Sequence, residues 1–350
     1  MSAYDLIIVG LGPAGSALGH RAQARGLRVL GIDPSPEWPN TYGLFRDELP
    51  RWLSDAPMYS ACFPTAKAIT THQLNRQYCI IDNDAWRSKL QDFPILQEEA
   101  CIESSTRVVA GGESVNAQVI VDARGLTYYE GIPVQQALGW FIPEDADDQW
   151  LSYDTDTGRF RYSFATPHGR LVEETLLVTN LVQPWQELED ALLSDYPTFV
   201  PDHIEKVLIP MGTPSHHPAA LPFGARAGFI NPISGYSLAR SLSLVDATLE
   251  ALWPTRRPAK NRLPWHSWSF RLDRKLCSVI QAVLTELRPS EVAEILEVIL
   301  GASISTQRGF LTLGNVRGTV WGMLRVFGAV PWRTRWNILS VIAARMVEKG

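Results

Sequence analysis

The sequence predicts an α/β protein in which a doubly wound, Rossmann-like domain carries an inserted β-rich domain and a helical C-terminal region. A glycine-rich loop at residues 10–15 joins an apolar run to a helical stretch near the start of the chain. Because 350 residues exceed a typical single domain, we expect an inserted part. Runs typical of strands follow at 135–142, 159–166 and 170–179. Runs with helical periodicity lie at 272–287, 290–300 and 333–348.

The N-terminal segment reads as strand, phosphate loop, helix and second strand. After a buried strand at residues 6–9, Gly10, Gly12 and Gly15 supply the tight turn, the close backbone approach to a pyrophosphate and the close packing of helix on strand. The helix N-terminus then faces the anion. Asp33 ends the second strand 18 residues beyond Gly15, where its carboxylate accepts hydrogen bonds from ribose hydroxyls. This unit predicts a dinucleotide site.

Two features indicate FAD rather than NAD as the dinucleotide. The phosphate loop contains Pro13 and Ala14, and residues 119–125 form a later strand that ends in Asp122 and Gly125. This pair of motifs resembles the flavoprotein hydroxylase and reductase superfamily, in which the second motif returns to the dinucleotide domain. The resemblance implies that all four of these residues contribute to an FAD site.

A third segment, residues 224–240, resembles the last flavin loop of that superfamily. It leads into a helix expected over 237–252, whose N-terminus would stabilise negative charge on a reduced flavin. Arg226 stands where many relatives have Asp. Whether this chain makes the contact that those relatives make with the ribityl chain of the flavin is therefore left open. The resemblance implies cofactor contacts from Gly228, Pro232, Gly235 and Tyr236.

Four separated segments resemble the lycopene cyclases of the plant and cyanobacterial type. They contain Trp-Pro-Asn-Thr-Tyr-Gly, Leu-Val-Glu-Glu-Thr, Ile-Pro-Met-Gly and Asn-Pro-Ile-Ser-Gly-Tyr, within residues 32–48, 171–175, 209–212 and 229–236. Order and spacing agree, so the resemblance spans about residues 1–255. Asn231 departs from the pattern, because those cyclases have His there and an amide does not titrate in the physiological range. Asn231 then orients a water at the catalytic site or holds the flavin loop.

The motifs divide the chain. We expect an FAD-binding domain over residues 1–126, with an insert at about 50–95, completed by residues 209–255. Residues 127–208 then form a substrate-facing sheet domain, and residues 256–350 form a helical region. Shorter elements are expected as a strand at 77–81 and helices at 84–91 and 185–195.

Glu173 and Glu174 are adjacent in an expected strand, so their side chains point to opposite faces and only one faces a cavity. The resemblance implies that Glu173 is the inward, catalytic acid, while Glu174 is favoured as an ion-pair partner. Cyclising an acyclic carotenoid end, in lycopene or a related compound, needs a proton donor, a carbocation shielded from water and loss of a ring proton. A carboxyl group in an apolar pocket stays protonated near neutrality and, once ionised, stabilises the cation. The resemblance implies reduced FAD as the working cofactor, NAD(P)H as its electron source and no net redox change.

Aromatic residues near these motifs either line an apolar tunnel, where their faces stabilise cations, or pack in the core. They are Trp140, Phe141, Tyr162, Phe164 and Tyr236.

Charge is distributed unevenly, although the net charge is only −5. Residues 251–350 contain 15 Lys or Arg against 6 Asp or Glu, a net charge of +9, and six of the twelve Trp. This composition suits an anionic membrane surface, and we expect a cytoplasmic protein that is peripheral on the inner face of the membrane. An ordinary helical subdomain with a solvated charged face is the alternative. The Trp residues expected at the interface include Trp265, Trp268, Trp332 and Trp336.

Several classes of partner are not expected. The acidic remainder of the chain argues against nucleic acid. The four cysteines form no Cys-x-x-Cys pair and no leader is apparent, which indicates free thiols in an intracellular protein. No run of 18 apolar residues indicates a transmembrane helix. His216 and His217 have no companion ligands at metal spacing, so no metal is expected.

Three functions remain open. The first is a lycopene-cyclase-like isomerase. The second is an FAD-dependent monooxygenase or reductase acting on a polyprenyl or aromatic substrate, which would consume NAD(P)H stoichiometrically. The third is a non-catalytic relative that binds flavin and membrane. The type of ring formed, and whether one or both ends of the carotenoid are cyclised, are left open by the sequence.

Overall fold

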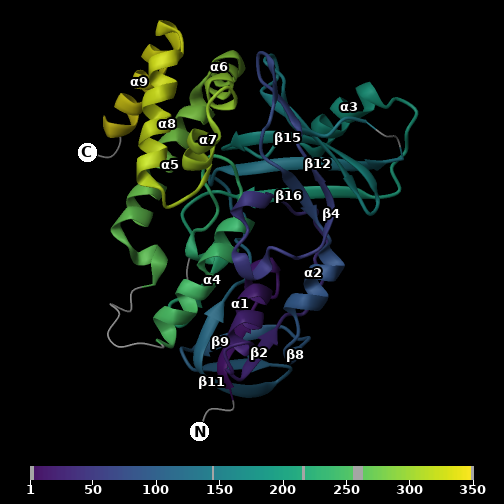
Figure 1. Cartoon of the computed structure of the whole chain (residues 1–350), viewed down its shortest axis with the longest axis vertical. Coiled ribbons are helices and arrows are strands. Elements are labelled where there is room, and N and C mark those ends of the chain that lie inside the picture. Colours follow the sequence, from purple (N-terminus) through teal and green to yellow (C-terminus); the bar gives the residue numbers. More distant parts are fainter. Residues whose placement is uncertain (1–3, 144–145, 215–216, 255–262, 348–350) are drawn as a thin grey trace.

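A computed structural model describes residues 4–143, 146–214, 217–254 and 263–347 of the chain, with side chains up to residue 345. The protein has three parts: an α/β domain that contains the N-terminus, a twisted sheet domain, and a group of C-terminal helices alongside them (Figure 1).

The α/β domain contains the segments expected to bind the dinucleotide. Its elements are β1 (Tyr4–Val9), α1 (Pro13–Gln23), β2 (Val29–Ile32), β8 (Ile95–Leu96), β9 (Ala100–Ser104), β10 (Arg107–Ala110), β11 (Glu113–Asp122), β17 (Leu221–Pro222) and α4 (Leu238–Leu252). The sheet has the order β8-β2-β1-β11-β10-β9; β8, β2, β1 and β11 are parallel, and β9 to β11 are antiparallel. Leu6 and Ile8 share a cluster with Leu18 of α1, whereas Ile7 packs with Ile102 of β9 on the other face. Burial on both faces explains why β1 is a continuous apolar run.

The twisted sheet lies above the α/β domain in the view of Figure 1. Its strands, in spatial order, are β16 (Ile204–Pro210), β12 (Val134–Ile142), β15 (Gly169–Thr179), β14 (Arg159–Thr166), β13 (Gln149–Tyr153), β5 (Thr65–Lys67) and β6 (Thr71–Gln73). Helix α3 (Trp185–Asp195) covers one face, where Trp140 packs with Leu188 and Leu192. The opposite face contributes the walls of a cavity described below.

The expected insert connects the two sheets. Its strands β4 (Met58–Cys62) and β7 (Tyr78–Ile81) form a small sheet of order β3-β7-β4 with β3 (Gly43–Phe45), which precedes the expected insert, and α2 (Asn83–Leu90) follows β7. Its central residues leave this small sheet: β5 pairs in parallel with β13, so the insert also extends the twisted sheet. Asp82 caps α2 by accepting a hydrogen bond from the N–H of Ala85 at 3.0 Å.

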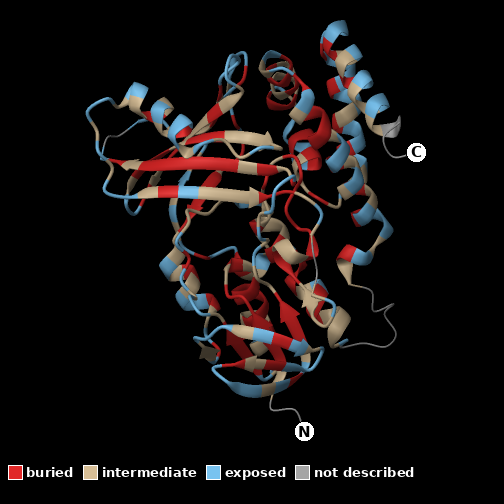
Figure 2. Cartoon of the chain, turned by 180° about the vertical axis from the view of Figure 1, so that it is seen from behind, coloured by how far each residue is buried: buried red, intermediate tan, exposed pale blue. Residues whose placement is uncertain are grey.

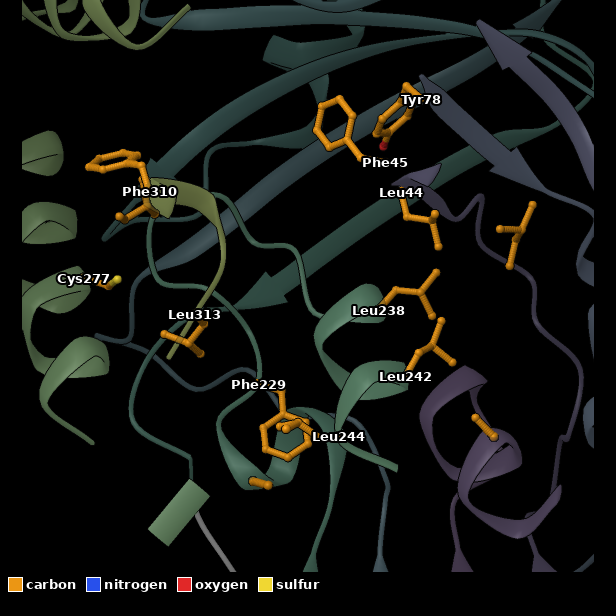
Figure 3. Packing of buried hydrophobic residues seen from close by; sticks show 14 of the residues in the cluster. Leu44, Phe45, Tyr78, Phe229, Leu238, Leu242, Leu244, Cys277, Phe310 and Leu313 are labelled. Atoms are coloured by element: carbon orange, nitrogen blue, oxygen red, sulfur yellow. The ribbon is translucent and has the colours of Figure 1, made fainter. Parts of the chain in front are cut away.

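The C-terminal region is helical. It consists of α5 (Trp268–Glu286), α6 (Pro289–Leu300), α7 (Ile304–Leu311), α8 (Val316–Ala329) and α9 (Trp332–Val347). Figure 3 shows one cluster that joins this region to α4, with Leu242 and Phe229 on one side and Cys277 and Phe310 on the other. The outer faces of α8 and α9 are largely exposed (Figure 2). Within the described residues, no helix is long and apolar enough to cross a membrane.

One expected interfacial residue lies elsewhere. Trp265 is 5 % exposed and packs against Phe223 and Phe229, so it belongs to the core beneath α5. Trp268 and Trp332, in contrast, are 70 % and 69 % exposed.

Most predicted elements are confirmed. Residues 185–195 form α3, and the strands predicted at 135–142, 159–166 and 170–179 are β12, β14 and β15. Helices α7 and α8 were not predicted, because glycines lower helix propensity. Here the glycines bring the two helices together: a Cβ on Gly318 would lie 2.4 Å from Cα of Gly309.

Candidate active site

A cavity of about 590 Å³ lies at the carboxyl ends of β1, β2 and β11. Ligands of open α/β sheets bind at this edge, where helix N-termini also point. Six of the residues expected to contact a dinucleotide line it: Gly10, Gly12, Pro13, Ala14, Asp33 and Gly125.

The three glycines of the phosphate loop have different surroundings. Gly10 has φ of +99°, and a Cβ there would lie 2.5 Å from the backbone nitrogen of Arg124. A Cβ on Gly15 would lie 2.0 Å from the carbonyl oxygen of Gly10, so α1 approaches the loop closely. At Gly12 a Cβ would meet no atom within 4 Å, because this residue faces the cavity. Gly12 is also the N-cap of α1 and provides no side-chain cap, which leaves the first N–H groups of the helix available to an anion.

Asp33 ties the phosphate loop to the end of β2. Its Oδ2 accepts a hydrogen bond from the N–H of Leu11 at 2.6 Å, and its Oδ1 accepts one from Ser35 at 2.9 Å. A carboxylate accepts about four hydrogen bonds, so Asp33 can hold the loop and still accept from a ligand hydroxyl in the cavity.

Asp122 lies behind this cavity and does not line it. It is 1 % exposed and accepts hydrogen bonds from Nε and Nη2 of Arg124, each at 2.9 Å, while Nε of Arg226 lies 3.8 Å away. Burial raises the pKa of Asp122, but the two guanidinium groups outweigh burial and hold that pKa below its ordinary value. Arg124 itself lines the cavity, and its guanidinium group is held at the wall by this ion pair with Asp122.

The last expected flavin loop divides between two sites. Ala225 and Ser237 line both the 590 Å³ cavity and the second cavity described next, whereas Tyr236 and Gly235 line only the second cavity. Gly228 and Pro232 are outside both linings, and their carbonyl oxygens accept hydrogen bonds from Arg274 at 2.8 Å and Gln281 at 2.9 Å.

The second cavity, of about 390 Å³, adjoins the first. Its walls come from β12, β14, β15 and β16 on one side and from the start of α4 on the other. Ser237, the N-cap of α4, also provides no side-chain cap, so a second helix N-terminus opens at the junction. Five residues line both cavities: Tyr42, Gly125, Ala225, Ser237 and Leu238.

Glu173 and Glu174 lie on opposite faces of β15, as strand alternation predicts. Glu173 lines the second cavity, where the Thr175 hydroxyl donates a hydrogen bond to its Oε1 at 2.7 Å. Burial, and then the negative charge of Glu205, raises the pKa of Glu173 to about 7. Glu174 faces the other way and accepts a hydrogen bond from Nε of Arg161 at 2.8 Å.

A second carboxylate, which the sequence analysis did not identify, faces the same cavity. Glu205 of β16 is 5 % exposed and accepts hydrogen bonds from the N–H and the hydroxyl of Thr41, both at 2.8 Å. Burial raises the pKa of Glu205, and the contacts with Thr41 oppose that rise.

Hydrogen-bonded aromatic residues form one end of the second cavity. The hydroxyl of Tyr78 lies 2.9 Å from that of Tyr236 and accepts a hydrogen bond from Tyr162 at 3.2 Å. Trp150 donates its Nε1–H to Tyr236 at 2.9 Å, and the two rings are stacked. Burial raises the pKa of each of these three tyrosines, so their hydroxyls stay neutral at physiological pH.

The other aromatic residues considered for a tunnel pack elsewhere. Trp140 lies under α3, on the face of the sheet opposite the cavity. Phe141 contacts His203, and Phe164 is 1 % exposed against Tyr78.

Asn231 lies outside the cavity that contains Glu173. Its Nδ2 donates to the carbonyl oxygen of Leu311 at 2.7 Å, and its Oδ1 accepts from the N–H of Ile233 at 2.8 Å. The side chain is 1 % exposed and borders a separate pocket of about 210 Å³. These contacts connect the loop before α4 to α7.

No cluster of three metal-binding side chains occurs among the described residues, and His216 lies outside them. The arrangement therefore comprises a dinucleotide-sized cradle with anion-binding backbone groups, next to an aromatic-walled cavity that contains a carboxyl group with a pKa near neutrality.

Solved structures with a similar fold include flavoenzymes. A geranylgeranyl bacteriochlorophyll reductase-like protein from Thermoplasma acidophilum is 15 % identical, with a TM-score of 0.70 over 94 % of this chain and 98 % of that one. The probable FAD-dependent monooxygenase PqsL from Pseudomonas aeruginosa is 13 % identical, with a TM-score of 0.58 over 83 % of this chain and 99 % of that one. The fold is therefore the expected FAD-type α/β architecture with a sheet domain and a helical C-terminal region.

Sequence comparison identifies the family. The lycopene beta cyclase of Synechococcus elongatus is 24 % identical, over 96 % of this chain and 96 % of the cyclase. The family model described as lycopene cyclase protein matches residues 67–316, which include both faces of the second cavity and most of the C-terminal helices. The chain belongs to the lycopene cyclase family.

Proposed function

We propose that the protein is an FAD-dependent isomerase that converts the acyclic ends of lycopene, or a related carotenoid, into rings. The single observation that carries this proposal is Glu173, a carboxyl group with a pKa of about 7 that faces an apolar, aromatic cavity beside the dinucleotide cradle. Family membership supports the carotenoid substrate.

The cradle fits FAD. Gly12 offers open space where a side chain would meet a pyrophosphate, and the uncapped N-terminus of α1 supplies N–H donors to it. Asp33 would bind the ribose, and Arg124 would face the phosphates. When bound in its reduced form, FAD supplies negative charge that stabilises a nearby carbocation; NAD(P)H is proposed as its electron source.

Glu173 would donate its proton to the terminal alkene of the substrate, so that its O–H bond breaks and a C–H bond forms. The resulting cation closes the ring through the neighbouring alkene, and a proton then leaves a ring carbon for the carboxylate of Glu173, which restores its protonated form. The composition of the substrate is unchanged. Ionised Glu173 and the faces of Tyr162 and Tyr236 would stabilise the cation, and the apolar walls would keep water away from it.

We assign Asn231 a structural part in this scheme. Both polar atoms of its side chain are engaged with backbone groups, so it would hold the loop before α4 and with it the N-terminus at the junction of the cavities.

Expression in a lycopene-accumulating bacterial host tests the proposal. Cyclic carotenoid should accumulate at the expense of lycopene, and the purified protein should consume NAD(P)H only to reduce its flavin. Stoichiometric NAD(P)H consumption with an oxidised or saturated product would instead favour the monooxygenase or reductase.

We also propose that α8 and α9 dock peripherally on the cytoplasmic face of an anionic membrane. An apolar groove of about 290 Å³, formed by α5, α8 and α9 with contributions from α6 and α7, has Leu324 and Leu339 at its mouth, 62 % and 45 % exposed. Trp321 precedes Leu324 by three residues and is 59 % exposed, so both lie on one face of α8. The exposed Arg317 and Arg325 lie one turn on either side of Trp321, where they would meet lipid phosphates.

Vesicle binding tests this docking surface. The protein should bind anionic vesicles more tightly than neutral ones, and binding should weaken with salt because charges are screened over about 8 to 10 Å at physiological ionic strength. Leu324→Glu should weaken binding, whereas Val200→Glu, on an exposed loop, should not. Equal binding to both vesicle types at all salt concentrations, or by both variants, contradicts the proposal.

A further inference from the structure

The two acids of the second cavity face each other across a glycine. In the register of the twisted sheet, Gly139 of β12 pairs with Glu173 of β15 on one side and with Glu205 of β16 on the other. Residues paired in this way point to the same face of a sheet, and two strand spacings separate the acids by roughly 10 Å between Cα atoms. Gly139 has no side chain of its own to separate them, and a methyl group of Leu171 packs over it, 2.6 Å from the place where a Cβ would lie.

The two carboxyl groups are held differently. Both oxygens of Glu205 accept hydrogen bonds from Thr41, one from its N–H and one from its hydroxyl, which favours the ionised form of Glu205. Glu173 accepts one hydrogen bond, from Thr175. When two nearby carboxyl groups compete for protons, the one with more donors ionises first and the other keeps its proton.

We infer that Glu205 is a positioning residue for the cyclisation: as a fixed anion held by Thr41, it keeps the proton on Glu173 until the substrate takes it. This inference rests on the proposed function of Glu173. It adds a role for the strand Ile204–Pro210 that the Glu-Glu-Thr motif alone does not provide.

Few other groups around Glu173 titrate between pH 5 and 9. The neighbouring hydroxyls belong to Tyr42, Tyr78, Tyr162 and Tyr236, whose pKa values burial raises further above the ordinary value for tyrosine. On the side of Glu205, His203 and His168 lie close enough to lower its pKa when they are charged. When the cyclisation rate is plotted against pH, its fall on the alkaline side (the alkaline limb) should therefore reflect the loss of the proton from Glu173.

The experiment is the pH profile of cyclisation by purified, flavin-reduced enzyme on lycopene in liposomes. In Glu205→Gln the alkaline limb should move by about one unit toward lower pH, with activity roughly fivefold below wild type at pH 7 and nearly equal to it at pH 5. Glu205→Asp should restore much of the wild-type profile because it keeps the charge. Thr175→Val should move the limb toward higher pH, because the Thr175 hydroxyl stabilises ionised Glu173.

An unchanged limb in Glu205→Gln, or a loss of activity that is equal at all pH values, would overturn the inference. If Glu205→Gln does not fold, Thr41→Val serves instead: it removes one donor to Glu205 and should move the limb in the same direction by a smaller amount. Glu173→Gln distinguishes failure of the inference about Glu205 from failure of the proposed function of Glu173. If it is inactive at every pH while Glu205→Gln has the wild-type profile, only the inference fails; if it cyclises lycopene normally, the proposed function of Glu173 fails as well.

Discussion

Gly12 and Gly15, three residues apart in the phosphate loop, should respond in opposite ways to the same substitution. In Gly12→Ala the added Cβ meets no protein atom within 4 Å, and the backbone angles of −61° and 178° suit any residue. The flavin-free protein should keep its stability or gain a few tenths of a kcal/mol, up to about 1 kcal/mol. In Gly15→Ala the Cβ would lie 2.0 Å from a backbone oxygen, which cannot move as the end of a flexible side chain can. Overpacking of this kind costs about 1 to 3 kcal/mol or more.

The assay measures flavin content and thermal unfolding of each purified variant, with and without FAD. Gly12→Ala should unfold like the wild type without FAD but retain little flavin, because its Cβ occupies the space for the pyrophosphate. Gly15→Ala should unfold several degrees lower in both states, at about 2 to 4 °C per kcal/mol. Gly328→Ala, where a Cβ also meets nothing within 4 Å but far from the cradle, is the matched control and should bind FAD normally. Wild-type flavin content in Gly12→Ala would refute the assignment of this cavity.

Two further predictions concern stability. Asn231→Ala removes the side-chain partner of the carbonyl oxygen of Leu311 and of the N–H of Ile233. The free energy of unfolding, measured by thermal unfolding, should therefore fall by about 2 to 4 kcal/mol. Wild-type stability together with lost cyclisation would instead indicate a chemical role for Asn231. The carboxyl group of Glu173 has a pKa of about 7 in the folded protein and an ordinary value of 4.5, so the folded state binds more protons between these values and stability falls as pH rises. At pH 8 the free energy of unfolding of Glu173→Gln should therefore exceed that of the wild type by up to roughly 3 kcal/mol, and at pH 5 the two should be nearly equal. A difference in unfolding free energy that does not change with pH would contradict the raised pKa of Glu173.

The elements of the dinucleotide domain could be predicted because each has a local cause. A buried parallel strand, a glycine turn and a helix leave patterns within about ten residues of one another. The same holds for the alternation that places Glu173 and Glu174 on opposite faces of β15. Residues 65–73 were harder: they join the twisted sheet only through pairing with β13, more than 70 residues later, and pairing of this kind leaves no local pattern.

Site residues could be predicted where a sequence motif contains them. They could not be predicted where the pairing of distant strands brings them to the cavity. Glu205 enters the cavity through the register of β16 on β12, which a single sequence does not specify. One signal was present: Glu205, Val207 and Ile209 alternate with Lys206, so a strand there would place Glu205 on an apolar face. Arg124 occupies the variable position of its motif, and its part in the cavity follows from its ion pair with Asp122. Trp265 is the opposite case. The composition of residues 251–350 predicted an interfacial position for it, whereas the structure places it in the core.

The central claim, that Glu173 gives the proton that starts ring closure, is tested most directly by comparing Glu173→Gln with Glu174→Gln in single-turnover cyclisation of lycopene by the reduced, FAD-loaded protein. Glu173→Gln keeps the shape and the flavin content but has no proton to give, so the rate should fall 10² to 10⁴-fold or more. Glu174→Gln, which lies on the opposite face and binds Arg161, should retain most of the activity. Equal rates in the two variants, or a larger loss in Glu174→Gln, would contradict the account.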